Sequence, residues 1–452
     1  MIKIFFLFLI FLAGKSFAFG TGIHTAPVII PGKLIRAAVR YPLSMYRLYR
    51  YGVNGRAESI PFQIDELNEF GDFILDKGTE PNSKESNGIF DEVDELSFMG
   101  DDVGPAIKPI SWPEGVPSSI YEIKLNPPHT VGVNMVAVQR PGAVYLAVFL
   151  RNAPTYSTKK YVVFDAPQSE VTTSRYRYGF DQKNWLVSRR VEVTDAKNPR
   201  SFDPILSTTT FYLRADFKYF LTFELNHNSI ESSLEAYKTG PIRTIVRISF
   251  HYNILRMKLD LGMFTEVSFF SNAVYLPAVI FNPIDSPKSL NSGSGMYYGM
   301  SFVENPQKYD IQTNMPEYQL GNSKIFDFFK SKKINSPSND YWISARGPDR
   351  MMYLEFTPSK SLQEAGVAPT LYRENMSSKE ILSRNNKIPN ALGKSPVNLG
   401  VYFDITKFTE GNHVMGFRLF FENVNDQNRL DVFKSLNQWN YTTTRFVPEK
   451  TK

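Results

Sequence analysis

The strongest constraint on the fold of this chain is a hydrophobic pattern of period two that continues over unusually long stretches. From Phe211 to Leu225 every second residue is apolar or aromatic, and most of the residues between them are polar. A second run, from Ile242 to Leu261, alternates in the same way and changes phase near Ile254, which predicts a bulge or bend there. Strict alternation is typical of half-buried strands. The sequence therefore predicts that each run forms one long β-strand, the second with a bulge or bend, in large packed sheets.

Size and composition indicate a folded protein with more than one core. The chain has 452 residues, of which 42% are hydrophobic, with 36 Phe and 24 Tyr. We expect a large antiparallel β-sandwich over residues 156–452 and a smaller N-terminal β domain over 19–155 that carries an acidic loop at 65–102. The absence of cysteine excludes disulfides, thiol catalysis and Cys-ligated metals.

The N-terminus has the pattern of a cleaved signal peptide. Lys3 precedes the apolar run Ile4–Ala13, and a small-residue cleavage site ends at Ala18. The apolar run is much shorter than the roughly 20 residues that a spanning helix needs, so residues 1–18 are predicted to be removed and to leave no membrane span. The sequence predicts a bacterial protein that is secreted or periplasmic, with no nucleic-acid partner and with an oligomeric state that the sequence leaves open.

Charge is strongly segregated along the chain. Between Asp65 and Asp102 there are thirteen Asp or Glu against Lys77 and Lys84, a net charge of −11, whereas the whole chain carries +6 and its remainder therefore +17. This asymmetry favours a cation site in the acidic stretch and an anionic partner for the basic remainder. The alternative is that the two parts form opposite solvated faces of one protein.

The acidic stretch contains a candidate calcium loop at residues 82–95. Calcium prefers six to eight oxygen ligands, which loops supply from alternating side chains around a glycine, here Gly88. Ser83 stands where a full EF-hand loop has Asp, so a looser calcium turn is the expectation, and an acidic surface hairpin without metal is the alternative. The candidate ligands are Glu85, Asn87, the carbonyl of Ile89, Asp91 and Asp94.

Two stretches resemble known proteins. The segments Pro61–Glu66, Asn87–Asp91 and Asp94–Met99 resemble a pattern found near the start of exported bacterial proteins that are mostly uncharacterised, and this resemblance implies no activity. Gly240–Arg243, at the start of a long amphipathic strand, is similar to strands in the large sandwiches of the galactose-mutarotase-like class. That class includes polysaccharide lyases and sugar-binding domains, so the resemblance implies a β-sandwich related to carbohydrate.

The polar positions of the second alternating run suggest a cationic surface. Arg243, Arg247 and His251 alternate with the apolar positions, and Arg256 and Lys258 follow the change of phase. Arginine pairs with carboxylate or sulfate groups through two parallel hydrogen bonds, so this face suits an acidic polysaccharide or another envelope component. A solvated outer face without a ligand is the alternative.

The leading functional hypothesis is an exported non-catalytic protein that binds a glycan or an envelope partner. A structural calcium ion is its candidate cofactor, and no organic cofactor is expected. The alternative is a polysaccharide lyase, which needs a base, a cation that neutralises the uronate carboxylate, and a donor to the leaving oxygen. The candidate residues for those roles are His227 or His251 as base, Arg243 or Arg247 as cation, and Tyr297 or Tyr298 as donor. Their convergence in one cleft would favour the lyase.

Overall fold

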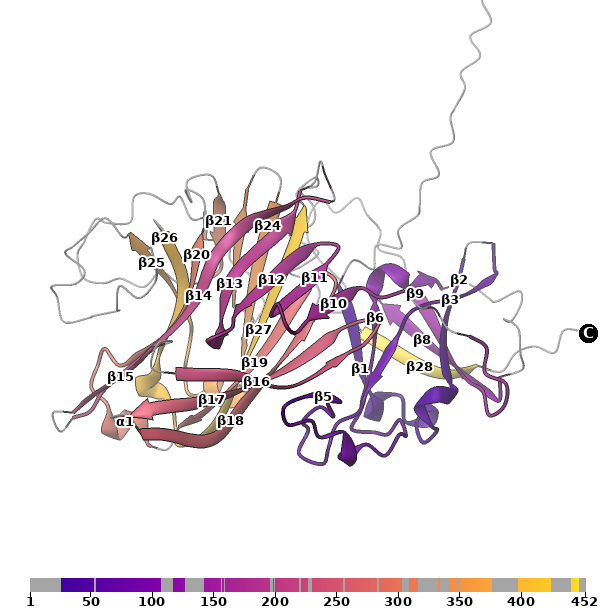
Figure 1. The fold of residues 1–452 in the computed structure, drawn as a ribbon, viewed down its shortest axis with the longest axis horizontal. Helices are drawn as coiled ribbons and strands as arrows, with labels where there is room; N and C mark the ends of the chain where they lie inside the picture. The colour runs from indigo at the N-terminus through magenta and orange to yellow at the C-terminus, as the bar shows by residue number, and fades with distance from the viewer. Residues whose placement is uncertain are drawn as a thin grey trace, which may run out of the picture.

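A computed structural model shows the predicted all-β architecture, with a large sandwich beside a smaller N-terminal part (Figure 1). The structure describes residues 26–52, 54–106, 117–126, 142–155, 157, 159–195, 198, 200–218, 221–226, 230–254, 257–282, 284–302, 309–315, 332–333, 341–347, 350–375, 397–423 and 440–446. Within those ranges no helix is both long and apolar enough to cross a membrane.

The large sandwich has two layers of mainly antiparallel strands. A parallel contact between Asn184 and Ser232 joins the two layers into a continuous hydrogen-bonded network. The first layer contains, in spatial order, β10 (Val162–Asp165), β11 (Glu170–Thr173), β12 (Tyr176–Asp181), β13 (Asn184–Thr194), β14 (Phe202–Asp216), β20 (Gly295–Phe302), β26 (Val397–Asp404) and β25 (Thr370–Asn375), and β15 (Thr222–Asn226) pairs with the end of β14.

The second layer follows the same antiparallel rule except at its last pair, β21 with β22, which is parallel. It contains β5 (Lys77–Gly78), β16 (Ile230–Thr239), β17 (Thr244–Ile254), β18 (Met257–Phe269), β19 (Ala273–Asn282), β27 (Gly411–Asn423), β24 (Arg350–Pro358), β23 (Tyr341–Arg346), β21 (Asp310–Thr313) and β22 (Lys332–Lys333).

Aromatic side chains from the two layers meet in the main core. Phe180 on β12 lies edge-to-face against Phe269 on β18, with ring centroids 5.5 Å apart. Tyr176 on β12 packs on Phe421 of β27 at 4.8 Å. These contacts are the expected consequence of period-two strands, because each strand turns one apolar face toward the opposing sheet.

The N-terminal part is a smaller two-layer structure. A three-stranded sheet of β1 (Pro27–Pro31), β6 (Glu95–Met99) and β4 (Gln63–Asp65) packs on a second sheet through buried side chains such as Phe98 and Leu146. The second sheet contains β28 (Asn440–Phe446), β8 (Ser119–Asn126), β9 (Gly142–Val148), β2 (Tyr46–Tyr51) and β3 (Ala57–Ser59), with β7 (Gly104–Pro105) paired to β9.

Helical structure is limited to short segments among the described residues. The α-helices are α1 (Ser286–Ser289) and α2 (Lys360–Glu364). The 3-10 turns are Gly32–Leu34, Arg36–Ala38, Leu43–Met45, Ser83–Glu85, Gly100–Asp102 and Ile405–Lys407.

Both long alternating runs are divided into two strands, which corrects the prediction of one strand in each. The chain reverses after Asp216, and β15 pairs back on β14 with Asp216 opposite Thr222. In the second run β17 ends at Ile254, which lies opposite Met257 at the start of β18. The predicted bend near Ile254 is therefore the end of a strand in an antiparallel pair.

The most C-terminal strand among the described residues belongs to the N-terminal part. β28 pairs with β8 from Asn440 opposite Asn126 to Phe446 opposite Ile120. Residues 440–446 were expected in the large sandwich, so a boundary near residue 155 does not by itself separate the two parts. The chain leaves the N-terminal part after β9 and returns to it at the C-terminal strand.

Alternation on β4 and β6 determines which residues face the sandwich. Ile64 and Phe98 point into the N-terminal core, so Asp65 and Glu95 lie on the opposite face of this sheet. Met99, on that same face, joins an apolar cluster with Trp342 of the sandwich. The junction between the two parts therefore combines apolar contacts with acidic side chains.

Candidate functional site

Arg243, expected on an exposed cationic face, is buried at this junction with 1% of its surface exposed. Its Nε donates to Asp65 Oδ2 at 2.8 Å, and its Nη2 donates to Glu95 Oε2 at 2.7 Å. The guanidinium lies 4.7 Å from the centre of the Phe73 ring, which adds a cation–π contact. Both carboxylates belong to the acidic stretch at residues 65–102. At this point the acidic stretch is therefore paired with Arg243, the residue directly before β17.

Two further side chains complete the surroundings of Asp65. Lys238 Nζ lies 3.0 Å from Asp65 Oδ1, and Gln63 Nε2 donates to both carboxylate oxygens at 2.8 and 2.9 Å. Burial alone would favour the neutral acid, but the charges of Arg243 and Lys238 and these hydrogen bonds outweigh it and lower the pKa of Asp65 to about 2. Asp65 is therefore a buried carboxylate that depends on its cations.

Arg247 is held in a second buried group of charges. Its Nε and Nη2 donate to Glu266 Oε1 at 2.9 and 2.6 Å, and Nη2 also donates to the carbonyl oxygen of Phe73 at 2.7 Å. Burial raises the pKa of Glu266, and Arg247 acts in the opposite direction. Glu235 lies 3.8 Å from Arg247 Nη1 and adds another acidic neighbour.

These contacts correct the picture of Arg243 and Arg247 as an exposed glycan-binding face. The alternation was read correctly, but the acidic segment covers this polar face at Arg243, directly before β17, and at Arg247 on β17. Nor are the acidic and basic parts opposite solvated faces at these residues, because they contact each other directly. The side chains of His251 and Lys258, and all of Arg256, lie outside the part of the chain that the structure describes.

The described candidates for lyase chemistry are already engaged in packing or ion pairs. Tyr297 and Tyr298 are neighbours on β20 and therefore point to opposite faces. Tyr297 is buried, and Tyr298 lies in the sandwich with its ring 5.4 Å from that of Phe417. Burial raises the pKa of Tyr298 to about 12. His227 lies outside the described residues, as does the side chain of His251.

The candidate calcium ligands form hydrogen bonds within the loop and to Asn68 outside it. Glu85 Oε2 accepts from the side-chain amides of Asn68 and Asn82 at 3.1 and 3.2 Å. Asn87 Nδ2 donates to Asp91 Oδ2 at 3.2 Å, and the Asn87 side-chain oxygen accepts from the backbone N–H of Ile89 at 2.7 Å.

Asp94 is buried below this loop rather than on its surface. Its two oxygens accept from the backbone N–H groups of Leu67 at 2.9 Å and Asp91 at 2.8 Å. Among the described residues no group of three or more His, Asp or Glu is arranged to hold a metal ion. Calcium binding at this loop stays a prediction.

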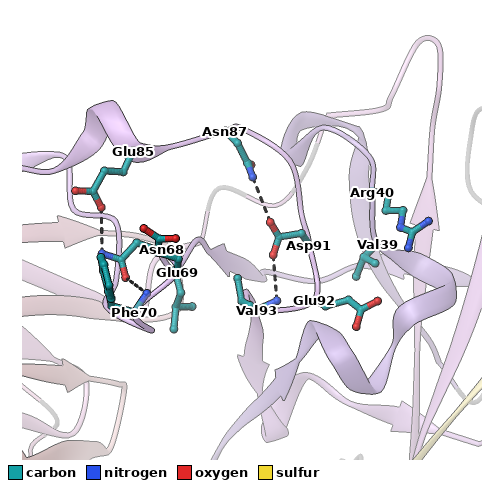
Figure 2. Close-up of a pocket in the computed structure, with 11 residues that line it drawn as sticks. Val39, Arg40, Asn68, Glu69, Phe70, Glu85, Asn87, Asp91, Glu92 and Val93 are labelled. Carbon is teal, nitrogen blue, oxygen red and sulfur yellow. Dashed lines mark hydrogen bonds between the residues drawn. The ribbon is translucent and has the colours of Figure 1, made fainter.

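The same loops surround a wide, open hollow of about 730 Å³ on the N-terminal part (Figure 2). All of its lining residues lie outside the named strands. They are Val39, Arg40, Leu67, Asn68, Glu69, Phe70, Glu85, Asn87, Asp91, Glu92 and Val93. The four carboxylates and one guanidinium in this set give the hollow a formal charge of −3.

The turn at Asn68–Gly71 places an aromatic ring at the edge of the hollow. The side-chain oxygen of Asn68 accepts from the backbone N–H groups of Phe70 at 3.0 Å and Asp72 at 2.9 Å, and Gly71 takes a φ of +87° that favours glycine. Phe70 is 81% exposed as a result, and Val93 across the hollow is 53% exposed. Phe70 was not predicted as a site residue, because the one local signal in the sequence is an aromatic residue between Asn68 and Gly71.

Two charged groups of the hollow have no hydrogen-bond or ion-pair partner among the described residues, namely the Glu69 carboxylate and the Arg40 guanidinium, and both are exposed. Glu92 is paired with Arg36, at 3.0 Å. Asp91 accepts from the backbone N–H of Val93 at 3.0 Å through its other oxygen. The hollow therefore presents hydrogen-bond acceptors beside exposed apolar surface.

Asp94 makes the stability of these loops depend on pH. Burial raises its pKa from 3.8 to about 6, its backbone hydrogen bonds act against this rise, and the charges of Asp91 and Glu66 add to it. Because the folded pKa lies above the unfolded value, the contribution of Asp94 to stability is complete below pH 3.8 and is lost as pH rises through about 6.

We expect the stability of the native protein relative to Asp94→Asn to fall by about 2 to 3 kcal/mol between pH 4 and pH 7, because a shift of one pKa unit corresponds to about 1.4 kcal/mol. Urea denaturation of both proteins across this range measures the difference. A difference that is constant with pH would contradict the assignment of this titration to Asp94.

Comparison with family models and with curated protein sequences finds no match for this chain. Among solved structures, it is similar to an alpha-mannosidase from Enterococcus faecalis V583, with 9% identity, a TM-score of 0.40, and coverage of 95% of this chain and 45% of that one. A protein in glycosyl hydrolase family 38 from Enterococcus faecalis matches with 8% identity, a TM-score of 0.39, and coverage of 94% and 46%.

A protein from Synechocystis sp. PCC 6803 matches with 10% identity and a TM-score of 0.30, covering 60% of this chain and 99% of that chain. The present chain spans less than half the length of the two Enterococcus proteins.

Proposed function

We propose that this chain is an exported, non-catalytic protein that binds a glycan or another component of the bacterial envelope, and that the ligand occupies the hollow of the N-terminal part. The observation that carries the proposal is the exposed ring of Phe70 beside a group of carboxylate and amide side chains. Arg243 and Arg247 are buried, so their side chains are not accessible to a ligand.

The chemistry of the hollow suits a sugar. The flat face of an aromatic ring packs against the C–H groups of a pyranose, and Phe70 offers this face to solvent. Carboxylate oxygens accept hydrogen bonds from hydroxyl groups, and the amides of Asn68 and Asn87 both donate and accept. A site with apolar surface and a few oriented polar groups is the usual composition of a ligand pocket.

The sign of the charge changes the expected partner. A formal charge of −3 in the hollow repels a polyanion, so an acidic polysaccharide does not fit this site. The expectation of such a partner used Arg243 and Arg247 together with His251, Arg256 and Lys258, and the first two are paired with acidic residues of the same chain. The proposal therefore concerns glycans without a net negative charge.

Export is part of the proposal and is tested separately. Residues 1–18 lie outside the described part of the chain, and their tripartite pattern supports removal after Ala18. Mass spectrometry of the protein recovered from the periplasm or the medium should find Phe19 at the N-terminus. A mature chain that retains Lys3 would contradict this step.

Substitution of Phe70 tests the binding function. We expect the purified protein to bind at least one oligosaccharide in a panel of uncharged and cationic envelope glycans, and Phe70→Ala to weaken that binding at least tenfold, because the stacking surface is lost. Isothermal titration calorimetry measures both affinities.

The matched control is Val163→Ala, which removes an exposed apolar side chain from β10, outside the hollow. This variant should bind as the native protein does. Equal affinity of native protein and Phe70→Ala for every bound glycan would place the ligand elsewhere.

A further inference from the structure

We propose that the glycan bound in the hollow carries protonated amines, as a polymer of glucosamine does. This inference rests on the proposed function and specifies the class of ligand at the same site. Three features of the hollow combine to support it: its open shape, the exposed ring of Phe70, and the excess of carboxylates around that ring.

Charge complementarity supplies the first step. Glu69, Glu85, Asp91 and Glu92 line the hollow together with a single cation, Arg40. The salt bridge of Glu92 is with Arg36, outside the lining set, and Glu69 has no partner among the described residues. A ligand that brings ammonium groups would form charge-assisted hydrogen bonds with carboxylates that are already in place.

The surroundings of the hollow supply the second step, because they favour a sugar over a basic peptide. Extended peptides are commonly bound by an exposed strand edge, and amphipathic helices by an apolar groove. None of the lining residues belongs to a named strand or to an α-helix, and Phe70 is presented by a four-residue turn. This site therefore offers a ligand the side chains of loops. It does not offer the backbone hydrogen-bonding groups of a strand edge.

A glucosamine chain and the hollow both place apolar surface next to charged groups. In a glucosamine chain each ring has a C–H face, hydroxyl groups and one amine. The hollow offers a matching set, since Phe70 and Val93 are exposed apolar groups beside the carboxylates of Glu69 and Asp91. One ring of the ligand can then stack on Phe70 while its amine and those of its neighbours contact acidic side chains.

The test compares two hexasaccharides with the same backbone, one of glucosamine and one of N-acetylglucosamine, by isothermal titration calorimetry at pH 6. We expect the glucosamine form to bind at least tenfold more tightly, and this preference to shrink when salt is raised from about 0.05 M to about 0.5 M, because exposed charges are then screened. Equal affinities, or a preference for the acetylated form, would overturn the inference.

Substitutions separate this inference from the proposed function. Glu69→Gln should weaken binding of the glucosamine form at least threefold and leave the acetylated form unchanged, whereas Phe70→Ala should weaken both forms. Glu410→Gln is the matched control, because Glu410 is an exposed glutamate of the large sandwich outside the hollow. This variant should bind both forms as the native protein does. If Phe70→Ala weakens both forms but Glu69→Gln weakens neither, the glycan site stands and the amine preference fails.

A hexalysine peptide is the last arm of the test. It should bind at least tenfold more weakly than the glucosamine hexasaccharide and be insensitive to Phe70→Ala, because it has charge without a sugar ring. Tighter binding of hexalysine, with the same sensitivity to Phe70→Ala, would assign the hollow to a basic peptide and overturn the inference. Failure of both hexasaccharides to bind would overturn it as well, while the wider glycan panel would still test the proposed function.

Discussion

Replacement of Arg243 by methionine is expected to lower the free energy of unfolding by about 3 to 5 kcal/mol. The substitution keeps much of the side-chain volume but removes the cation between Asp65 and Glu95. Asp65 is then left buried with Lys238 as its one remaining cation, and loss of a buried ion-pair partner is strongly destabilising. Urea denaturation at pH 7, followed by tryptophan fluorescence, measures the loss.

The control for Arg243→Met is Arg36→Met. Arg36 also forms an ion pair with a glutamate of the acidic stretch, Glu92, but the two side chains are 70% and 40% exposed. Exposed pairs contribute little, so this variant should lose less than about 1 kcal/mol. Similar losses for the two variants would mean that Arg243 is not a buried partner of the acidic stretch.

Phe90→Ala is expected to cost about 3 to 5 kcal/mol, in the range found for truncation of a buried phenylalanine. Phe90 is fully buried in the N-terminal core and lies edge-to-face against Tyr46, with ring centroids 5.4 Å apart. Its backbone also holds the loops of the hollow, because its N–H donates to the carbonyl of Tyr41 and its carbonyl accepts from the N–H of Arg40. Thermal and urea unfolding measure the effect.

The neighbouring residue supplies the matched control for Phe90. Ile89 is 39% exposed, so Ile89→Ala should change the free energy of unfolding by about 0.5 kcal/mol or less. The pair therefore tests which of two adjacent apolar residues points inward. A larger cost at Ile89 than at Phe90 would reverse that assignment.

The secondary structure of this chain was largely accessible from its sequence, because period-two alternation is a direct consequence of strand geometry. The ends of strands were less accessible. Between Asp216 and Thr222 the alternation continues through a reversal of the chain without a glycine or proline, and so it predicted one strand where there are two. Alternation reports which face a residue occupies and does not report where the chain turns.

The surroundings of the polar face could not be predicted from the sequence. The pattern placed Arg243 and Arg247 correctly on one side of a strand, but it contained no information about a segment more than 140 residues away that covers that side. Thirteen carboxylates and an excess of cations elsewhere were evident in the composition, yet composition does not show which charges meet. Tertiary packing brought Asp65 and Glu95 to Arg243.

The candidate site was only partly predictable for a similar reason. Asn87 and Asp91 were identified as candidate calcium ligands, and both line the hollow. Phe70 was not identified, because a single exposed aromatic residue in an acidic loop has no periodic signature. Its exposure results from the Asn68 turn, a local feature whose importance becomes evident once the opposing loop at Asp91–Val93 is in place.

The acidic stretch is neutralised in part by Arg243 of the same chain, through ion pairs with Asp65 and Glu95. A double-mutant cycle with Asp65→Asn and Arg243→Met tests it directly, with the free energy of unfolding measured for the four proteins at pH 7. The direct contact at 2.8 Å between two buried groups predicts a coupling energy of at least about 2 kcal/mol. A coupling energy within about 0.3 kcal/mol of zero, as expected for distant and independent residues, would contradict the claim.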